Sequence, residues 1–582
     1  MEQLNEILGA INGVLWHDWV LVFIVGVGVL FTLWSVFTQY HALTHGVQVI
    51  RGKFDHKDAP GAINHFQALS AALSATVGLG NIGGVAIAIA IGGPGAVFWM
   101  WIVGFLGMAI KTTEVTLSML YRNTDDPENP HGGPMWVAKK GFEKFGPAWK
   151  PVGVIFGGIF CVTLLVSTVT GGNMFQAWNV AVIMEQYTGL PQIGTGIILT
   201  VLVGAVIIGG IKRIGSVAGA LVPLMCGLYL LAALYVVIVN IEQVPGLFKL
   251  IFASALNPSE AQGAFLGGGA GYAFLWGMKR ALFSNEAGQG SSPIAHSAAK
   301  TDEPVREGVV AGLEPFIDTL VVCTLTALVI LASGAWNRGP EAVLEVPPKI
   351  VQTGPNTWTM EDTPLPENQV AEWVLGEDQV FMIAHTGVTA DQTGTDRVRW
   401  HGTVVEQGKQ LVVRWSPLQS ATQPTLVDAG IYGSYLGAAF TSHAFDRVTP
   451  GLGAWLVTIA SWLFAISTMI SWSYYGEQGM VYLFGTRSVV PYRVVYCLLV
   501  LVACSGFITT EAALDNLTGL GTGVMLFANI PIILIFGNQA IKAYRRYISR
   551  LKAGEFHAHE ASPLADLVEG KPPREDDGSA GR

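Results

Sequence analysis

Apolar residues occur in this chain as long runs, not as the short periodic stretches typical of soluble proteins. A helix needs about 20 mostly apolar residues to cross the hydrocarbon core of a bilayer. About eleven runs approach that length, at residues 19–37, 69–91, 96–119, 152–184, 194–210, 216–239, 264–283, 309–331, 454–474, 496–508 and 524–541. The pattern predicts an all-α polytopic membrane protein in a lipid bilayer, with an N-terminal helix at 19–37.

Two polar segments stand apart from these runs. Residues 336–425 are rich in Pro, Thr and Val and contain strand-like pieces such as Gln410–Arg414. They predict a small β-rich insert, with a long disordered loop as the alternative. Residues 546–582 are charged and carry Pro and Gly, so we expect a disordered tail. The membrane domain then has two parts, residues 1–335 and 426–545.

Basic residues lie beside every second predicted connection. Lys and Arg occur near residues 51–57, 139–150, 212–213, 279–300, 487–493 and 545–552. Because cytoplasmic connections carry an excess of Lys and Arg, these connections are expected on the cytoplasmic side. The N-terminus and the 336–425 insert are then extracytoplasmic, and the C-terminus is cytoplasmic. The expected location is the cell membrane, the inner one where a cell has two.

Composition agrees with a membrane protein and excludes several functions. Charged residues make up 13% of the chain and hydrophobic residues 51%, whereas soluble domains carry about 25% charged residues. The net charge of -9 argues against nucleic acid as a partner. The five cysteines lie in apolar runs without zinc-type spacing. With no Walker loop, metal cluster or nucleophile elbow in the sequence, we expect a protein that is not an enzyme and has no cofactor.

The second apolar run contains a candidate break in its helix. Two glycines, Gly78 and Gly80, flank Leu79, and the polar Asn81 follows. A helix broken at membrane depth leaves carbonyls that bind a cation and amides that bind a carboxylate. A close-packed contact between intact helices is the alternative.

Two further segments have features of the same kind of binding site. Residues 267–271 hold four glycines and predict a second interrupted helix, or else a loop before the helix. In the run at 454–474, Phe464, Ser467 and Thr468 share one helix face. Their oxygens suit sodium, although hydroxyls also bond back to their own helix.

Charged residues near the predicted spans require a partner or an exit to water. Lys111 and Glu114 are three residues apart and predict an ion pair on one helix face. Lys279, Arg280, Glu286 and Glu477 lie near the expected cytoplasmic ends of their spans. They either extend to the interface or contribute to a cytoplasmic gate.

Three blocks of the sequence carry a family resemblance. Residues 92–101 (GGPGAVFWMW), 282–291 (LFSNEAGQGS) and 472–477 (WSYYGE) resemble the signatures of the alanine or glycine:cation symporters. The resemblance covers nearly the whole chain apart from the insert and the tail. It implies a leucine-transporter-like fold of two inverted five-helix repeats, preceded here by one extra helix.

The resemblance also implies a set of binding residues. Its implied sodium ligands fall into two groups: Thr76 and Asn81 in one, and Ser74, Val77, Phe464, Ser467 and Thr468 in the other. The implied substrate contacts are Thr76, Leu79, Gly80, Asn81, Gln176, Gly268, Gly269 and Trp472, with Trp472 limiting the pocket to small side chains. Many family members have Thr where this chain has Leu79, so the order among glycine, alanine and serine stays open.

The expected function is therefore secondary symport, in which sodium entry drives uptake of small neutral amino acids such as alanine and glycine. Sodium acts as the coupling ion. Three alternatives stay open: another amino acid or proton coupling on the same fold, an amino-acid sensor without flux, and, most remotely, a membrane-embedded enzyme. The sequence indicates no particular oligomeric state.

Overall fold

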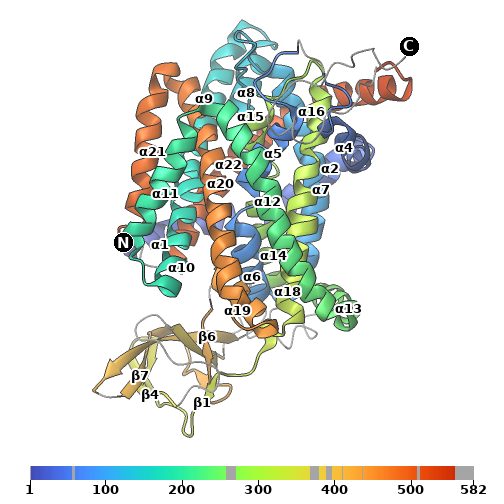
Figure 1. Cartoon of the computed structure of the whole chain (residues 1–582). Coiled ribbons are helices and arrows are strands. Elements are labelled where there is room, and N and C mark those ends of the chain that lie inside the picture. The colour runs from blue at the N-terminus through green and yellow to red at the C-terminus, as the bar shows by residue number, and fades with distance from the viewer. Residues whose placement is uncertain are drawn as a thin grey trace, which may run out of the picture.

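The computed structural model is a helical bundle with a β-sheet insert at one end (Figure 1). It describes residues 2–55, 59–256, 270–366, 379–387, 396–408, 410–435, 437–506 and 511–556. The α-helices are α1 (Glu2–Leu15), α2 (Asp18–Trp34), α3 (Thr38–His41), α4 (Val47–Ile50), α5 (His65–Thr76), α6 (Val85–Gly92), α7 (Gly95–Tyr121), α8 (Pro134–Glu143), α9 (Lys150–Val169), α10 (Phe175–Thr188), α11 (Gln192–Ile207), α12 (Gly210–Val239), α13 (Val244–Leu256), α14 (Ala270–Asn285), α15 (Ser292–His296), α16 (Pro304–Ala311), α17 (Leu313–Pro315), α18 (Thr324–Ala332), α19 (Gly437–Val448), α20 (Leu452–Phe484), α21 (Val489–Ala503) and α22 (Glu511–Lys552).

Tighter and wider helical turns join several of these helices. The π-helical turns are η1 (Ala42–Gly46), η2 (Gly80–Gly84), η4 (Thr170–Met174) and η7 (Phe316–Cys323). The 3₁₀ turns are η3 (Pro147–Trp149), η5 (Ile241–Gln243), η8 (Ala335–Asn337) and η9 (Thr486–Ser488). Such π turns concentrate at functional sites, and η2, η4 and η7 all lie in the predicted membrane domain.

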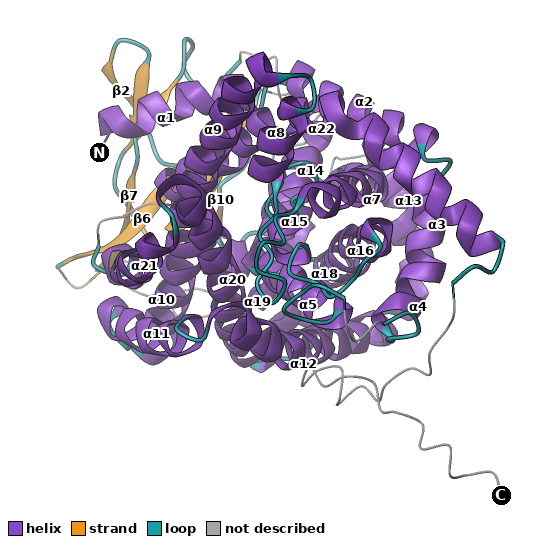
Figure 2. Cartoon of the chain, turned by 90° about the horizontal axis from the view of Figure 1, so that it is seen from above, coloured by secondary structure: helices purple, strands orange, loops and turns teal. Residues whose placement is uncertain are grey.

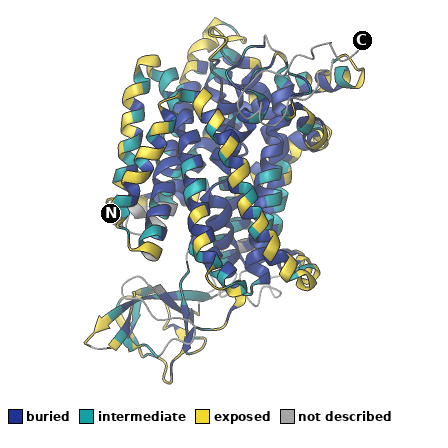
Figure 3. Cartoon of the chain, in the orientation of Figure 1, coloured by how far each residue is buried: buried dark blue, intermediate teal, exposed yellow. Residues whose placement is uncertain are grey.

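Long apolar helices confirm the predicted membrane class. Within the described residues, eight helices are long and apolar enough to cross a bilayer, and a bent pair adds a ninth if it is one span. Helices α11 and α14, of 16 residues each, occupy two further predicted runs. The outer faces of helices such as α2, α9, α12 and α21 expose large apolar side chains, as lipid contact requires (Figure 3). How many of the eleven predicted helices cross the membrane stays a prediction.

The first broken helix lies where the sequence predicted it. Helix α5 begins with a capping box in which Asn64 and Gln67 bond reciprocally, and it ends at Thr76 because Val77 is extended (φ -78°, ψ 94°). The chain resumes with η2 and α6 at a bend of 52°. The break places backbone groups in the middle of the bundle.

A second break follows α14, at a place that the sequence did not predict. Residues 286–291 are non-helical, and Glu286, Gly288 and Gly290 have φ values of 54°, 84° and 82°. Positive φ is easy for glycine and uncommon for glutamate, so the two glycines allow this turn before α15 begins. The predicted break at 267–271 falls mostly outside the described residues, because α14 is described from Ala270 onward.

Long helices hold the two broken helices in place. Helix α7 packs against α14, α16 and α2, and α20 packs against α5, α9, α12 and α19. Seen along the bundle in Figure 2, α5, α15, α16 and α18 lie inside a ring of the longer helices. The broken helices are therefore shielded from the surrounding lipid.

The insert consists of antiparallel strands between α18 and α19. They are β1 (Ala342–Val343), β2 (Ile350–Gly354), β3 (Thr357–Met360), β4 (Thr363–Pro364), β5 (Gln379–His385), β6 (Arg397–Gln407), β7 (Gln410–Trp415), β8 (Leu418–Gln419), β9 (Thr425–Leu426) and β10 (Gly430–Gly433). The larger sheet has the order β1-β10-β5-β6-β7-β4, with β9 paired to β5, and the smaller has the order β2-β3-β8. Buried Trp400, Met382 and Val413 form part of the core between them.

The insert and the last helix both extend beyond their predicted boundaries. The larger sheet continues past residue 425, because β10 pairs with both β1 and β5. Helix α22 continues past residue 546 to Lys552. The predicted disorder of the tail concerns mainly residues 557–582, which lie outside the described part of the chain.

Packing between α7 and α14 gives a test of the fold. A Cβ added at Gly277 would lie 2.4 Å from the Ala96 carbonyl oxygen. We expect Gly277→Val to lower the free energy of unfolding by about 1–3 kcal/mol, measured by thermal unfolding in detergent. The control is Gly158→Ala, where an added Cβ meets nothing within 4 Å. Equal unfolding temperatures for both variants would contradict this packing.

Candidate functional site

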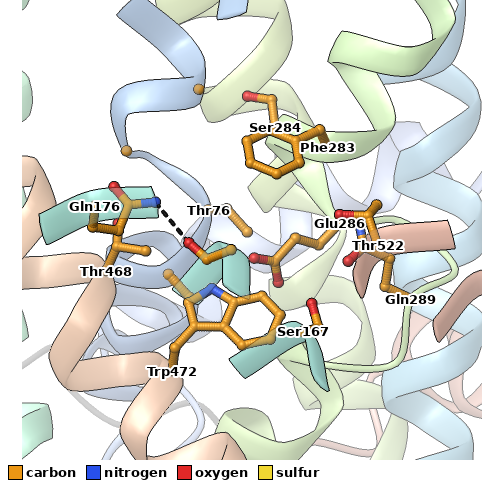
Figure 4. A pocket seen from close by; sticks show the side chains of 14 residues that line it. Thr76, Ser167, Gln176, Phe283, Ser284, Glu286, Gln289, Thr468, Trp472 and Thr522 are labelled. Atoms are coloured by element: carbon orange, nitrogen blue, oxygen red, sulfur yellow. Dashed lines mark hydrogen bonds between the residues drawn. The ribbon is translucent and has the colours of Figure 1, made fainter. Parts of the chain in front are cut away.

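A small cavity lies where the two broken helices meet (Figure 4). It is lined by Ala75, Thr76, Gly78, Gly80, Ser167, Gly171, Gln176, Phe283, Ser284, Glu286, Gln289, Thr468, Trp472 and Thr522. These residues come from α5, the α5–η2 break, η2, α9, η4, α10, α14, the α14–α15 break, α20 and α22. Most of the side chains are polar, so the cavity suits a small polar solute better than a lipid or a purely apolar ligand.

The backbone of the first break forms one wall. Asn81 folds back on the break, since its Oδ1 accepts from the Gly78 amide at 2.8 Å and its own amide donates to the Gly78 carbonyl at 3.1 Å. Leu79 and Gly80 begin η2, and the first amides of a helix have no partner within it. The predicted carboxylate-binding amides therefore lie beside the cavity. The Leu79 side chain is buried and absent from the lining.

A buried carboxylate lies behind this wall. Asp318 in η7 is fully buried. Its carboxylate accepts from Asn81 Nδ2 at 2.5 Å, from Ser284 Oγ at 2.9 Å and from Thr319 Oγ1 at 2.8 Å. Asn81 Nδ2 also lies 2.9 Å from Ser284 Oγ. This oxygen-rich cluster, the Asp318 cluster, contains one of the predicted sodium ligands, Asn81.

Asp318 and Ser284 were not among the residues predicted from the sequence. One feature of the sequence could have identified Asp318. It is an ionisable residue inside the apolar run at 309–331, and such a residue indicates a functional position by default. Ser284 lies in the 282–291 block, but nothing in its sequence context shows that it faces Asn81.

A second group of oxygens lies between α5 and α20. Ser74 Oγ donates to the Ser467 carbonyl at 2.6 Å, and Ser467 Oγ lies 2.8 Å from the Phe464 carbonyl and 3.3 Å from the Ser74 carbonyl. Thr468 Oγ1 is buried and has no hydrogen-bond partner among the residues that the structure describes. A Cβ added at Gly78 would lie 2.8 Å from that oxygen. The α5–α20 cluster thus consists of Ser74, Phe464, Ser467 and Thr468, four of the five residues predicted for one sodium site. The fifth, Val77, is buried and lies at the end of α5.

Aromatic rings bound the cavity on two sides. In Figure 4, Phe283 and Trp472 lie on opposite sides of the space. Gly172 packs so closely on Trp472 that an added Cβ would lie 2.4 Å from Cγ of the indole. Gln176 points into the cavity; its Nε2 donates to the Gly171 carbonyl at 3.1 Å, and its Oε1 has no partner within the described residues.

The predicted substrate contacts therefore fall into three sets. Thr76, Gly80, Gln176 and Trp472 line the cavity. Leu79 and Asn81 lie in the wall behind it, and Gly268 and Gly269 lie outside the described residues. Glu286 and Gln289 line the cavity although the sequence analysis assigned them no binding role.

The donors present suit an alkali cation better than a transition metal. Within the described part of the chain, no group of three or more His, Cys, Asp or Glu side chains is arranged to hold a metal ion. The two clusters instead offer hydroxyl, carbonyl and carboxylate oxygens, which are hard ligands.

Comparison with known proteins gives consistent matches. The model of the sodium:alanine symporter family matches residues 1–353 and 420–561. The chain is 33% identical over 542 residues to the sodium/alanine symporter AgcS of Methanococcus maripaludis, covering 93% of this chain and 97% of that protein. It is 30% identical over 552 residues to the putative sodium/proton-dependent alanine carrier protein YrbD of Bacillus subtilis, covering 95% and 94%.

A solved structure is similar at lower identity. The transporter MhsT in complex with L-phenylalanine aligns with a TM-score of 0.48 and 14% identity, over 83% of this chain and 96% of that one. The family match omits residues 354–419, which form most of the insert. The insert is therefore an addition to the part of the chain that the family model describes.

The contact between Gly172 and Trp472 gives a test of the cavity. We expect Gly172→Ala to push the indole into the cavity and to weaken binding of labelled alanine about tenfold. Gly171→Ala is the matched control, because a Cβ there would meet only Phe283, at 3.8 Å. Unchanged binding in Gly172→Ala would show that this cavity does not hold the amino acid.

Proposed function

The chain belongs to the sodium:alanine symporter family, and we propose that it couples sodium entry to the uptake of small neutral amino acids such as alanine and glycine. The observation that supports this proposal most directly is the cavity between two broken helices with an oxygen-rich cluster on each side. Such breaks are a common way to bind a zwitterion and a cation at the centre of a membrane protein.

The amino acid occupies the cavity in a defined orientation. Its carboxylate binds at the start of η2, where the amides of Leu79 and Gly80 and the positive end of the helix favour an anion. Its ammonium group needs acceptors, and Gln176 Oε1 is a buried acceptor without a partner among the described residues. Phe283 and Trp472 then leave room for a hydrogen or a methyl group and exclude larger side chains.

The first sodium ion binds at the Asp318 cluster. Asn81 and the carbonyl of Thr76 are the ligands expected from the sequence, and Ser284 and Asp318 add a hydroxyl and a carboxylate. A buried carboxylate without a matching cation is costly. Sodium supplies that charge. Its binding takes the place of the hydrogen bond that Ser284 donates to Asp318, and it requires the Asn81 side-chain amide to turn so that Oδ1, which now accepts from Gly78, faces the ion.

The second sodium ion binds at the α5–α20 cluster. The carbonyls of Ser74 and Val77 and the oxygens of Phe464, Ser467 and Thr468 surround this position. Because the ligands belong to both α5 and α20, the ion holds the inner half of the first broken helix against a long, continuous helix. Each sodium charge gains about 2.3 kcal/mol when it crosses a potential of 100 mV in the favourable direction.

The proposed orientation places the insert and the N-terminus outside the cell and the C-terminus in the cytoplasm. The distribution of Lys and Arg along the sequence supports it. The insert then lies at the outer end of the bundle, and α8, α15 and α16 lie at the cytoplasmic end (Figure 1).

Uptake of labelled alanine into liposomes tests the function. We expect an inward sodium gradient to drive accumulation that unlabelled glycine inhibits, and a potassium gradient to drive none. Accumulation driven by a proton gradient alone would replace sodium with protons as the coupling ion. Binding of alanine without uptake under any gradient would favour a sensor over a transporter.

Substitutions in the two clusters test the ion sites. We expect Asp318→Asn and Thr468→Ala each to lower the apparent sodium affinity of uptake by about tenfold, because each removes an oxygen ligand or its charge. Their controls are Asp362→Asn, in the insert, and Thr163→Ala, whose hydroxyl bonds back to Phe160 on the same helix. The proposed ligands would be wrong if the half-saturating sodium concentration matched that of the controls.

A further inference from the structure

Two short segments lie side by side near α15 and α16, at the end of the bundle opposite the insert (Figure 1). One segment, residues 60–63, leads into α5, and the other, residues 297–301, follows α15. Ile63 and Ala299 form a parallel bridge, the Ala62 amide donates to the Ala298 carbonyl at 2.7 Å, and the Lys300 amide donates to the Ile63 carbonyl at 2.8 Å. The inner halves of both broken helices are thus joined through their flanking backbone.

A single arginine fastens both segments. Arg122, at the end of α7, donates to four carbonyls, those of Pro60 at 3.1 Å, Ser297 at 3.0 Å, Ala299 at 2.8 Å and Thr301 at 2.6 Å. One of these carbonyls precedes α5 and three follow α15. Only the planar guanidinium has enough donors in a fixed fork to bind all four, and a lysine ammonium has three.

A single carboxylate joins the same two helices closer to the cavity. Glu307 on α16 is fully buried. One of its oxygens bonds to Nδ1 of His65, the first residue of α5, and the other lies 2.5 Å from Nδ1 of His296, the last residue of α15. Both histidines are also buried. Glu307 therefore bridges the inner halves of the two broken helices.

The two helices differ in how firmly they are held. Helix α15 has further buried partners, because His296 Nε2 lies 2.7 Å from Glu314, and Ser292 also donates to Glu314 at 2.7 Å. Glu314 in turn lies 3.3 Å from Lys111 on α7. On α5, His65 bonds to Glu307, and its other ring nitrogen lies 3.9 Å from Asp55, which is less deeply buried. Buried charged and polar side-chain contacts at this end are therefore fewer for α5 than for α15, although α5 also packs against α12 and α20.

We propose that Arg122 and Glu307 form a latch that closes the cavity toward the end opposite the insert, Arg122 by binding the backbone before α5 and after α15, and Glu307 by bridging His65 and His296. Opening exposes Glu307 and its histidines to water, which offsets the loss of their mutual bonds. The claim that transport needs this opening rests on the proposed function; the latch itself does not.

Labelling of a cavity cysteine from each side of the membrane tests the latch. The reporter is Ser167→Cys, in the cavity lining, treated with a membrane-impermeant thiol reagent in sealed vesicles of both orientations. Gln352→Cys, in the exposed part of the insert, identifies the side on which the insert lies. Labelling of the parental chain, whose five cysteines are all free, sets the background.

We expect Glu307→Gln and Arg122→Lys each to accelerate labelling about tenfold, and only from the side opposite the insert. The control is Arg550→Gln, which removes a partly exposed pair with Glu303 at the same end of the bundle, and its labelling should stay unchanged. Arg122→Lys keeps the positive charge. If Glu307→Gln does not fold, the labelling of Arg122→Lys alone tests the latch.

Two results would overturn the latch. One is unchanged labelling in folded Arg122→Lys, and the other is equal acceleration from both sides, which indicates general loosening of the bundle. Labelling needs neither sodium nor an amino acid. The latch can therefore be tested even if the chain does not take up alanine.

Discussion

The structure depends on one constraint of the bilayer: a helix broken inside hydrocarbon must find partners for its freed backbone groups within the protein. At the first break, Asn81 provides part of the answer by binding the amide and the carbonyl of Gly78. The other backbone groups freed by this break face the cavity or the second broken helix. The long helices α7 and α20 keep lipid away from both breaks. The proposed binding site is thus a consequence of how the break is satisfied.

The same constraint governs the charged residues. Lys111 lies 3.3 Å from Glu314 and 3.9 Å from Glu114, so the ion pair with Glu114 that the sequence predicted is present, and Glu314 is the nearer partner. Asp318 is held by an amide and two hydroxyls, without a basic side chain among those hydrogen-bond partners. Lys111 is therefore paired with carboxylates of the protein, whereas these hydrogen-bond partners of Asp318 are all neutral.

The insert adds a contact at the other end of the first broken helix. Arg399 in β6 donates to the carbonyl of Ala90 near the end of α6 at 2.7 Å. At the base of the insert, Arg338, which follows α18 and η8, pairs with Glu341 at 2.8 Å, and Glu341 accepts from the amide of Gly433, shortly before α19, at 2.9 Å. Helix α19 in turn covers η2, where Thr441 donates to the Ile82 carbonyl at 2.9 Å. The insert is therefore connected to the outer half of the broken helix both directly and through α19.

The sequence by itself determined the membrane class, the family, and the position of the first break, because apolar run length and the Gly78–Asn81 motif are local properties of the chain. It also placed Phe464, Ser467 and Thr468 on one helix face. Tertiary structure alone decided that Asn81 faces Asp318, 237 positions away, and that the second break follows Asn285. Glycines permit a break without fixing where it falls, and packing accompanies the one observed at residues 286–291. The contacts of Arg122 and Glu307 also depend on tertiary structure. They join segments that are far apart along the chain, and no local sequence pattern predicts that these segments meet.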